Sequence, residues 1–154
     1  MKPWLVVKFG GTSVATAARW QVIADRACRA LAEHRVWIVV SALAGVSDLL
    51  ERAITDAAAG RRSTAFGRAR KLHDRLADEL GLDDDARLPV TRLVERVDSL
   101  LRGIRLTREA PPRLRAQILA TGELCSTELG IHVLRARGLT AVRVDARDLL
   151  TSSE

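Results

Sequence analysis

A chain of 154 residues has about the size of one domain and is long enough to bury a continuous core. A hydrophobic fraction of 47% and a charged fraction of 29% are ordinary for a globular protein and exclude an intrinsically disordered one. The formal net charge is +6, but basic and acidic residues are interleaved, as at Arg92, Glu95 and Asp98, which indicates solvated helix faces and argues against a nucleic-acid surface.

No segment predicts a membrane span or an export signal. The longest apolar stretch, Trp37 to Val46, is too short to cross a bilayer, and the N-terminal apolar run ends at Lys8. Cys28 and Cys125 show neither a CxxC motif nor a metal-binding spacing, so we expect two buried structural thiols. The chain is therefore expected to be cytoplasmic.

Two strands joined by a helix are predicted at the start of the chain. Trp4 to Phe9 is rich in bulky apolar residues and lies between a proline and a glycine pair, which is typical of a buried strand. From about Ala15 to Glu33, apolar side chains recur at steps of three and four, as on one face of a helix. Val36 to Val40 is a continuous apolar run, typical of a strand covered on both faces of a parallel sheet. Together they predict a right-handed βαβ crossover.

Helical patterns dominate the rest of the chain. Three of them cover residues 46–59, 64–80 and 88–106. From Leu114 to Ala136, apolar or small residues at steps of three and four predict one long helix or two short ones, which Gly138 is placed to end. Alternation over Thr140 to Asp145 predicts a third strand. The whole pattern predicts an α/β layer structure in one domain.

The strongest motif is KFGGTSV, Lys8 to Val14, at the predicted end of a strand and start of a helix. Its glycine pair lets the backbone turn tightly and bring N–H groups close to an anion, and Lys8 adds a full positive charge. The motif is neither a P-loop nor a dinucleotide fingerprint. From the residues alone, it fits a phosphate site and equally a plain turn in which Thr12 or Ser13 caps the helix.

Two further motifs place polar residues in comparable positions. SALAGVS, Ser41 to Ser47, again joins a strand to a helix, and parallel strands would place it at the same sheet edge as the first motif. Its hydroxyls suit a small polar substrate, although Ser47 also suits a helix cap. Gly122 costs about 1 kcal/mol relative to alanine within a helix, which calls for the close approach of a ligand or of another backbone. Glu123 beside it is, by itself, typical of a solvated helix face.

The sequence predicts neither a catalytic triad nor a metal cluster. His34, His73 and His132 share no spacing with carboxylates or cysteines, so we expect surface or partly buried histidines. No nucleophile elbow accompanies a Ser/His/Asp or Cys/His set.

Four stretches of the chain resemble aspartate kinases, which are members of the amino-acid kinase fold. They are KFGGTSV at Lys8 to Val14, VVSALAGVSDLL at Val39 to Leu50, TGELCSTEL at Thr121 to Leu129 and LTAVRVDARDLL at Leu139 to Leu150. Their order and spacing match over the whole chain. The resemblance implies a three-layer αβα sandwich with a mainly parallel sheet, of which residues 1–154 form the N-terminal portion.

The resemblance also implies roles for individual residues. The residues expected to grip the phosphates of ATP are Lys8, Gly10, Gly11 and Ser13, with Lys8 as the catalytic group. The residues expected to hold L-aspartate are Ser41, Ala42, Ser47 and Glu123. Glu123 would pair with the α-ammonium group of the substrate. Mg²⁺ is expected to arrive on the phosphates of ATP, without a dedicated protein ligand.

The pattern of the family continues past Glu154 with an arginine for the substrate α-carboxylate, an adenine pocket and, in many members, regulatory ACT domains. We therefore expect a fragment that does not phosphorylate aspartate by itself, from a homo-oligomeric parent that some relatives fuse to a second biosynthetic enzyme. Two alternatives stay open. One is another kinase of this fold, acting on acetylglutamate, glutamate or a nucleotide, and the other is a non-catalytic interaction or regulatory fragment.

Overall fold

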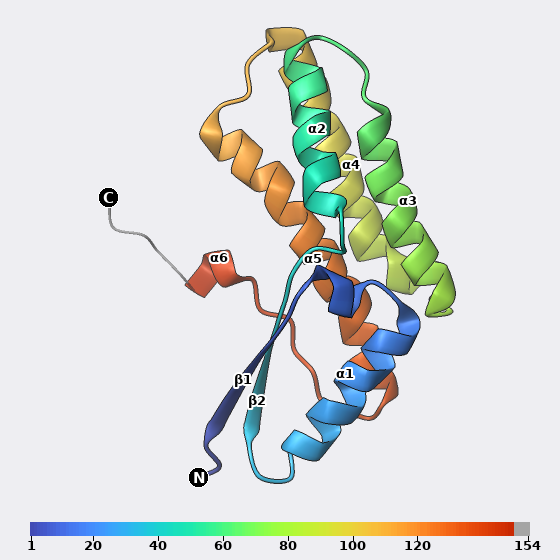
Figure 1. Cartoon of the computed structure of the whole chain (residues 1–154), viewed down its shortest axis with the longest axis vertical. Helices are drawn as coiled ribbons and strands as arrows, with labels where there is room; N and C mark the ends of the chain where they lie inside the picture. Colours follow the sequence, from blue (N-terminus) through green and yellow to red (C-terminus); the bar gives the residue numbers. More distant parts are fainter. Residues whose placement is uncertain (150–154) are drawn as a thin grey trace.

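The computed structural model describes residues 1–149 and begins with a parallel βαβ unit (Figure 1). Strand β1 (Trp4–Phe9) leads through a short 3-10 helix, η1 (Gly11–Val14), into α1 (Ala17–Ala30), and the chain returns along β2 (Arg35–Val40). The two strands pair in parallel, which confirms the predicted βαβ unit and the position of both strands.

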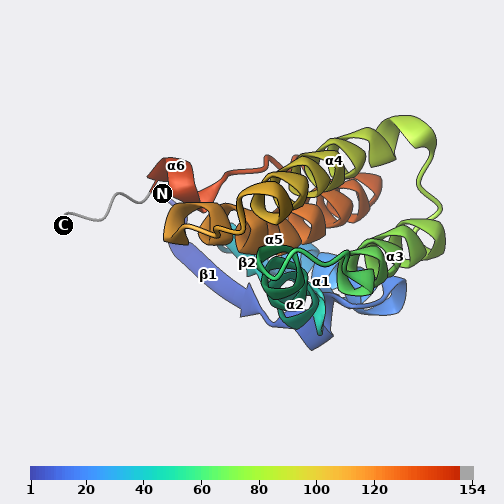
Figure 2. The same cartoon turned by 90° about the horizontal axis from the view of Figure 1, so that it is seen from above.

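Four helices follow and pack together as a helical layer, most of which lies beyond the end of the sheet (Figure 1, Figure 2). They are α2 (Val46–Ala58), α3 (Thr64–Glu79), α4 (Asp84–Thr107) and α5 (Pro112–Ala136). α5 is one continuous helix, where one or two were predicted. It packs along α4 and α2 and also contacts α1 and β2, so it links the helical layer to the sheet.

The described residues cover one face of the sheet. Exposed and half-buried residues alternate along both strands. On the outward face, Val6 is 65% and Val39 39% exposed, and the rings of Trp4 and Trp37 lie 6.1 Å apart. The expectation that β2 is covered on both faces is wrong for this part of the chain, because α1 and α5 supply the apolar contacts of a single face.

One continuous core joins the βαβ unit to the helical layer. The largest fully buried apolar side chains come from η1 and from α1 to α5 and include Val14, Trp20, Ile54, Leu76, Ile104 and Leu129. Along α5, the buried positions Ile118, Gly122 and Cys125 follow the predicted spacing of the apolar face. The periodicity of this segment therefore identified the buried side of the helix correctly.

The predicted third strand is wrong. Thr140 to Asp145 forms no strand in the described residues, and its side chains Val142 and Val144 are 78% and 46% exposed. The segment instead leads to a single helical turn, α6 (Ala146–Leu149). Alternation shows only that two faces differ in polarity, whereas a strand also needs a neighbouring strand for its N–H and C=O groups. Leu150, the last residue of the fourth quoted stretch, lies outside the described residues.

Other differences from the predictions are small. The helices predicted over 46–59 and 64–80 each end one residue earlier. α4 begins at Asp84 and not at Leu88, because the carboxylate of Asp83 accepts a hydrogen bond from the Ala86 amide at 2.9 Å and caps the helix. Cys28 is exposed, contrary to expectation, since it lies beside the core position Ala27 on α1 and points away from it. No helix in residues 1–149 is both long and apolar enough to cross a membrane.

Candidate functional site

The first two motifs lie against each other at the ends of the paired strands. The Ser41 amide donates to the Phe9 carbonyl oxygen at 3.1 Å, and the Ala44 amide donates to the Gly11 carbonyl oxygen at 3.2 Å. The prediction that both loops meet at one edge of the sheet is therefore confirmed.

Gly11 is the residue that allows this close approach. A Cβ atom built on Gly11 would lie 2.6 Å from the carbonyl oxygen of Ala42 and 3.1 Å from the amide nitrogen of Ala44. Real Cβ atoms essentially never come so close to a backbone oxygen, so any other residue would push the two loops apart. Gly11 is required here by contact, and its φ angle plays no part.

The peptide groups of the glycine turn have a defined orientation. In a planar trans peptide the C=O and the following N–H point in opposite directions. The carbonyls of Phe9 and Gly11 are held by the second loop, and the Gly10 carbonyl accepts from the Ser13 amide at 2.8 Å. The amides that follow these carbonyls, on Gly10, Gly11 and Thr12, therefore point away from the second loop and from the turn. Within the described residues, none of them donates a hydrogen bond to the protein.

Free amides beside a lysine suit an anion. Lys8 is the penultimate residue of β1 and its side chain is exposed. Thr12 is exposed and Ser13 is half-buried in η1. Neither caps α1, because Thr16 does so by accepting from the Arg19 amide at 3.4 Å. The helix cap expected at Thr12 or Ser13 in the plain-turn alternative is therefore wrong. The free amides of the glycine turn form a backbone nest, a geometry that suits an anion.

The second loop presents its polar residues around a buried alanine. Ser41 is half-buried, Ala42 is 5% exposed, and Gly45 stands before α2 with φ of 79°. That left-handed conformation favours glycine. Ser47 is exposed in the first turn of α2, and no side-chain hydrogen bond caps this helix. The alternative in which Ser47 serves as the helix cap is therefore wrong.

Gly122 brings the third motif to the same place. A Cβ atom on Gly122 would lie 2.9 Å from Ala42 Cβ and 3.0 Å from Val46 Cγ1. The sequence analysis expected a ligand or another backbone beside this glycine, whereas the neighbours in the structure are side-chain atoms of the second loop and of α2. Ala42 thus lies between Gly11 of the first motif and Gly122 of the third, and the three motifs form one cluster.

Glu123 follows Gly122 and is exposed on α5. In residues 1–149, no basic side chain forms an ion pair with its carboxylate. Its backbone carbonyl accepts a hydrogen bond from the Thr127 hydroxyl at 2.8 Å, which is internal to the helix. The carboxylate is thus free for a cationic group, as on any solvated helix face.

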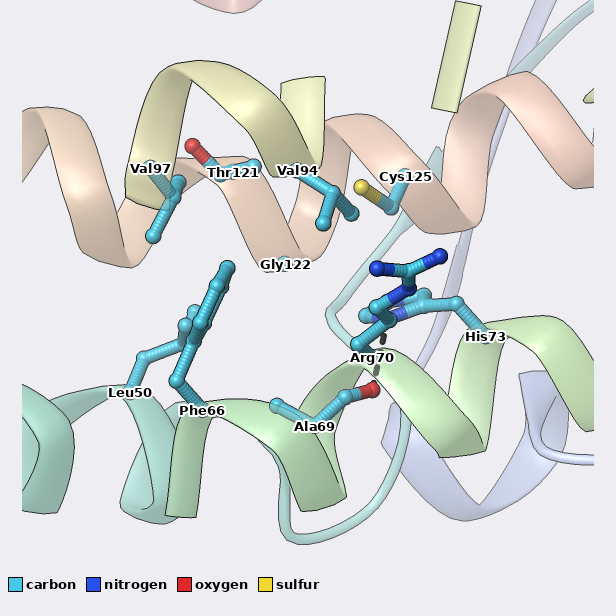
Figure 3. Close-up of a pocket in the computed structure, with 10 residues that line it drawn as sticks. All are labelled: Leu50, Phe66, Ala69, Arg70, His73, Val94, Val97, Thr121, Gly122 and Cys125. Carbon is cyan, nitrogen blue, oxygen red and sulfur yellow. Dashed lines mark hydrogen bonds between the residues drawn. The ribbon is translucent and has the colours of Figure 1, made fainter. Parts of the chain in front are cut away.

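A small cavity of about 10 Å³ lies behind Gly122 and is lined by residues of α2 to α5 (Figure 3). Its wall includes His73, which is only 4% exposed, so the expectation of surface or partly buried histidines is wrong for this residue. Nδ1 of His73 lies 2.9 Å from the Ala69 carbonyl oxygen and must donate to it, since a carbonyl only accepts. Nε2 is buried without a partner in the described residues.

Burial lowers the pKa of His73, and the Ala69 carbonyl, the Asp74 carboxylate and the Gly122 carbonyl oppose this effect only in part. Cys125 lines the same cavity, and burial raises the pKa of its thiol to about 12. A thiol of that pKa is not a nucleophile near neutral pH. A groove of about 90 Å³ between α3 and α4 also reaches His73. Neither cavity is lined by Lys8, Ser41 or Glu123, so they are not the cluster of the three motifs.

The contacts of two residues escaped the sequence analysis, which did not single out Arg19 and named Ala44 only as part of the second motif. The guanidinium group of Arg19 donates to the carbonyl oxygen of Thr12, and the amide of Ala44 donates to that of Gly11. Neither residue type stands out in its pattern, because an exposed arginine on a helix and an alanine in a loop are both common. Only the folded backbone reveals them.

A backbone nest beside Lys8 at the end of β1, joined by a polar loop and an exposed carboxylate, is chemically suited to an anion and a cationic group held near each other. Residues 3–153 match the model of the amino acid kinase family, and the chain belongs to this family. Its α/β fold is the fold that the sequence predicted.

The relatives of this chain are aspartokinases. The chain is 34% identical over 152 residues to the aspartokinase of Chlamydia muridarum, covering 97% of this chain and 32% of the relative. It is 30% identical over 155 residues to lysine-sensitive aspartokinase 3 of Escherichia coli, covering 100% of this chain and 33% of the relative. The chain thus spans about a third of the length of the curated relatives it matches.

The fold is similar to that of a solved aspartokinase. The structure of E. coli aspartokinase III in complex with aspartate and ADP superimposes with a TM-score of 0.74 at 28% identity, over 90% of this chain and 30% of that one. The structure of the same enzyme with lysine and aspartate gives a TM-score of 0.76 at 29% identity, over 91% and 30%. The recognised resemblance is thereby confirmed.

Proposed function

We propose that this chain forms the phosphate-gripping and aspartate-binding part of an aspartate kinase. The enzyme transfers the γ-phosphate of ATP to the β-carboxylate of L-aspartate and yields 4-phospho-L-aspartate. The relatives named aspartokinase, and the similar structure that holds aspartate and ADP, support this function. Because the chain matches about a third of these relatives, the proposal concerns its own residues as one portion of such a site.

The observation that carries the proposal is the cluster around Ala42. At both Gly11 and Gly122, atoms of the second loop occupy the space that a Cβ atom would need. The nest and the exposed Glu123 are therefore held at fixed positions relative to that loop. A kinase needs this because its rate depends on holding donor and acceptor in line. Two loops and a helix segment that served no common site would have no reason to meet at two glycines that other residues cannot replace without displacing their neighbours.

The chemistry of the reaction fits this set of residues. The β-carboxylate of aspartate has a reference pKa of about 3.9, so it is ionised at neutral pH and attacks without a general base. The difficulty is to bring two anions together. In this proposal Lys8 and the free amides of Gly10, Gly11 and Thr12 stabilise the charge on the transferred phosphoryl group. Mg²⁺ comes with the phosphates of ATP.

The acceptor side is assigned to the second loop and α5. Ser41 and Ser47 offer hydroxyls to the carboxylates of aspartate, and the backbone at Ala42 lies between them. Glu123 pairs with the α-ammonium group, which gives this exposed carboxylate a role beyond solvation. We place Ser13 with the phosphates through its position in η1.

A chimaera tests the function directly. Residues 1–154 would replace the matching third of E. coli lysine-sensitive aspartokinase 3, and aspartyl phosphate would be trapped with hydroxylamine in the presence of ATP, Mg²⁺ and aspartate. We expect turnover that falls about 100-fold or more in kcat with Lys8→Ala, because a charge contact of the transition state is removed. Lys71→Ala, at an exposed position on α3, is the matched control. A folded chimaera without turnover, or equal rates for both variants, would refute the proposal.

A further inference from the structure

Two neighbouring side chains of α1 reach back to the glycine turn. The Arg19 guanidinium donates to the Thr12 carbonyl oxygen, and Nε1 of Trp20 donates to the Val14 carbonyl oxygen at 3.0 Å. Trp20 is 1% exposed and packs where Gly130 leaves room for its ring, so it is part of the core. Arg19 is exposed, and its contact is therefore the one that core packing does not require.

Arg19 acts on a particular peptide group. The carbonyl of Thr12 and the amide of Ser13 belong to the same planar unit. That amide donates to the Gly10 carbonyl at 2.8 Å, so the Thr12–Ser13 peptide is held at its oxygen by Arg19 and at its nitrogen by Gly10. Because the Ser13 amide bonds to the Gly10 carbonyl, a fixed Thr12–Ser13 peptide also fixes that carbonyl. The Gly10 carbonyl and the Gly11 amide belong to one planar peptide, so the direction of the free Gly11 amide is fixed as well.

We propose that Arg19 is a positioning residue for phosphate binding, which holds the Thr12–Ser13 peptide so that the free amides of the glycine turn face the phosphates. The inference rests on the proposed function, since it deepens the role of the same turn. Arg19 also places a positive charge beside the nest that no carboxylate neutralises within the described residues.

The helix that carries Arg19 is well anchored. The Thr16 hydroxyl caps α1, and the amide of Ala17 donates to the carboxylate of Glu79 on α3 at 3.2 Å. Together with the buried Trp20, these contacts hold the first turn of α1 against the helical layer. A guanidinium extended from a rigid turn loses less entropy in making its hydrogen bond, which is the requirement for preorganisation.

The first measurement uses the 154-residue chain without ligand. Solvent exchange of the Ser13 amide, followed by NMR, reports directly on the peptide that Arg19 is proposed to hold. We expect exchange about tenfold faster in Arg19→Met, which keeps the length of the side chain but removes the donors, and a rate near the original in Arg19→Lys. Arg26→Met is the matched control, because it removes the same charge from an exposed position of the same helix.

The second measurement adds inorganic triphosphate, a probe that needs the turn and no adenine pocket. We expect saturable shifts of the Gly10, Gly11 and Thr12 amide signals, with an affinity about tenfold lower in Arg19→Met than in Arg26→Met. Lys8→Ala should bind triphosphate more weakly than Arg19→Met and Arg26→Met. Both arginine variants lose one positive charge, so a difference between them measures position and not net charge.

The outcomes separate the inference from the proposed function. Equal Ser13 exchange in Arg19→Met and Arg26→Met would overturn the positioning role whatever the ligand does. Equal triphosphate affinity in these two variants, with weaker binding in Lys8→Ala, would overturn the inference and leave the phosphate site in place. Failure of the unaltered chain to bind triphosphate at the turn would overturn the phosphate role of Arg19 and of Lys8 together, even where Ser13 exchange responds.

Discussion

At the scale of single residues, Glu123 offers the sharpest test of which ligand lies where. Its carboxylate is exposed, and its neighbour Gly122 is fixed against the second loop. In the chimaera, Glu123→Gln keeps the shape of the side chain and removes the charge that pairs with an ammonium group. We expect a higher KM for aspartate, equivalent to a loss of about 2 to 4 kcal/mol, and a nearly unchanged KM for ATP.

The control for this prediction is Glu95→Gln, an equally conservative change at an exposed position on α4. It should leave both KM values unchanged. A rise in the KM for ATP without one for aspartate would show that Glu123 serves the nucleotide and would contradict its assignment.

His73 makes a prediction about stability and pH. Because burial lowers its pKa in the folded chain, the unfolded chain binds more protons between that lowered value and the unfolded reference of about 6.5. The contribution of neutral His73 to the free energy of unfolding is therefore complete at pH values above the unfolded reference pKa, and it is lost as the pH is lowered through this interval. Urea unfolding at pH 7.5 and pH 5 measures the fall, which we expect to be smaller in His73→Gln.

The matched control is His34→Gln, at a half-buried position between α1 and β2. It should keep the pH dependence of the original chain. Because His73→Gln also alters packing, the quantity to compare is the change in the free energy of unfolding between the two pH values and not its absolute value. An identical fall between the two pH values in His73→Gln would show that another group titrates with unfolding.

At the scale of elements, two glycines in helices predict opposite effects of the same substitution. Gly122→Ala gains about 1 kcal/mol in helix propensity, but its Cβ atom would meet Ala42 and Val46 at 2.9 and 3.0 Å and press α5 away from the second loop. Gly103, within α4, has nothing within 4 Å of the position that a Cβ atom would take. We expect Gly122→Ala to lower the melting temperature and Gly103→Ala to raise it.

Thermal unfolding of the two variants beside the original chain decides this prediction. If the Gly122 variant were as stable as the Gly103 variant, the close packing of α5 on the second loop would be absent in solution. The argument for one cluster of three motifs would then fail, because that packing is the contact that brings Glu123 to the loop.

The success of the sequence analysis also differs between elements. The bounds of β1 and the buried face of α5 were predicted correctly because their signals are local: a bulky apolar run between proline and glycine, and a period of three and four over a long segment. The expected burial of β1 was wrong for one of its faces, on which Trp4 and Val6 are exposed. The segment Thr140 to Asp145 was mistaken for a strand because pairing is not local, and alternation cannot supply a partner. Gly122 was recognised as needing a close neighbour, but the sequence could not say that the neighbour is Ala42.

The candidate site shows the same division. Lys8 and the glycine pair stand out by composition, and the resemblance to aspartate kinases gave them roles. The orientation of the amides depends on carbonyls held by Ala44 and Arg19, which lie on other elements. Such contacts arise only when the backbone folds, so no periodicity or motif predicted them.

At the scale of the whole molecule, the continuous core predicts that the βαβ unit and the helical layer unfold together. Buried side chains run without interruption from Val14 in η1 to Leu129 in α5. Replacing the exposed Trp4 and Trp37 by Phe leaves Trp20, 1% exposed, as the single fluorescent reporter of the βαβ side. Far-UV circular dichroism reports mainly on α2 to α5, which contain most of the helical residues.

We expect the two signals to give the same midpoint in urea, as a two-state transition requires. Leu76→Ala, in α3 on the far side of the core, should then lower both midpoints equally, with a loss of about 2 to 5 kcal/mol. If this substitution moved the circular dichroism midpoint and left the Trp20 midpoint in place, the helical layer would be an independent unit. The cluster at Ala42 joins Gly11 of the βαβ unit to Gly122 of the helical layer. With an independent helical layer, the contact with Gly122 would be lost while the glycine turn was still folded.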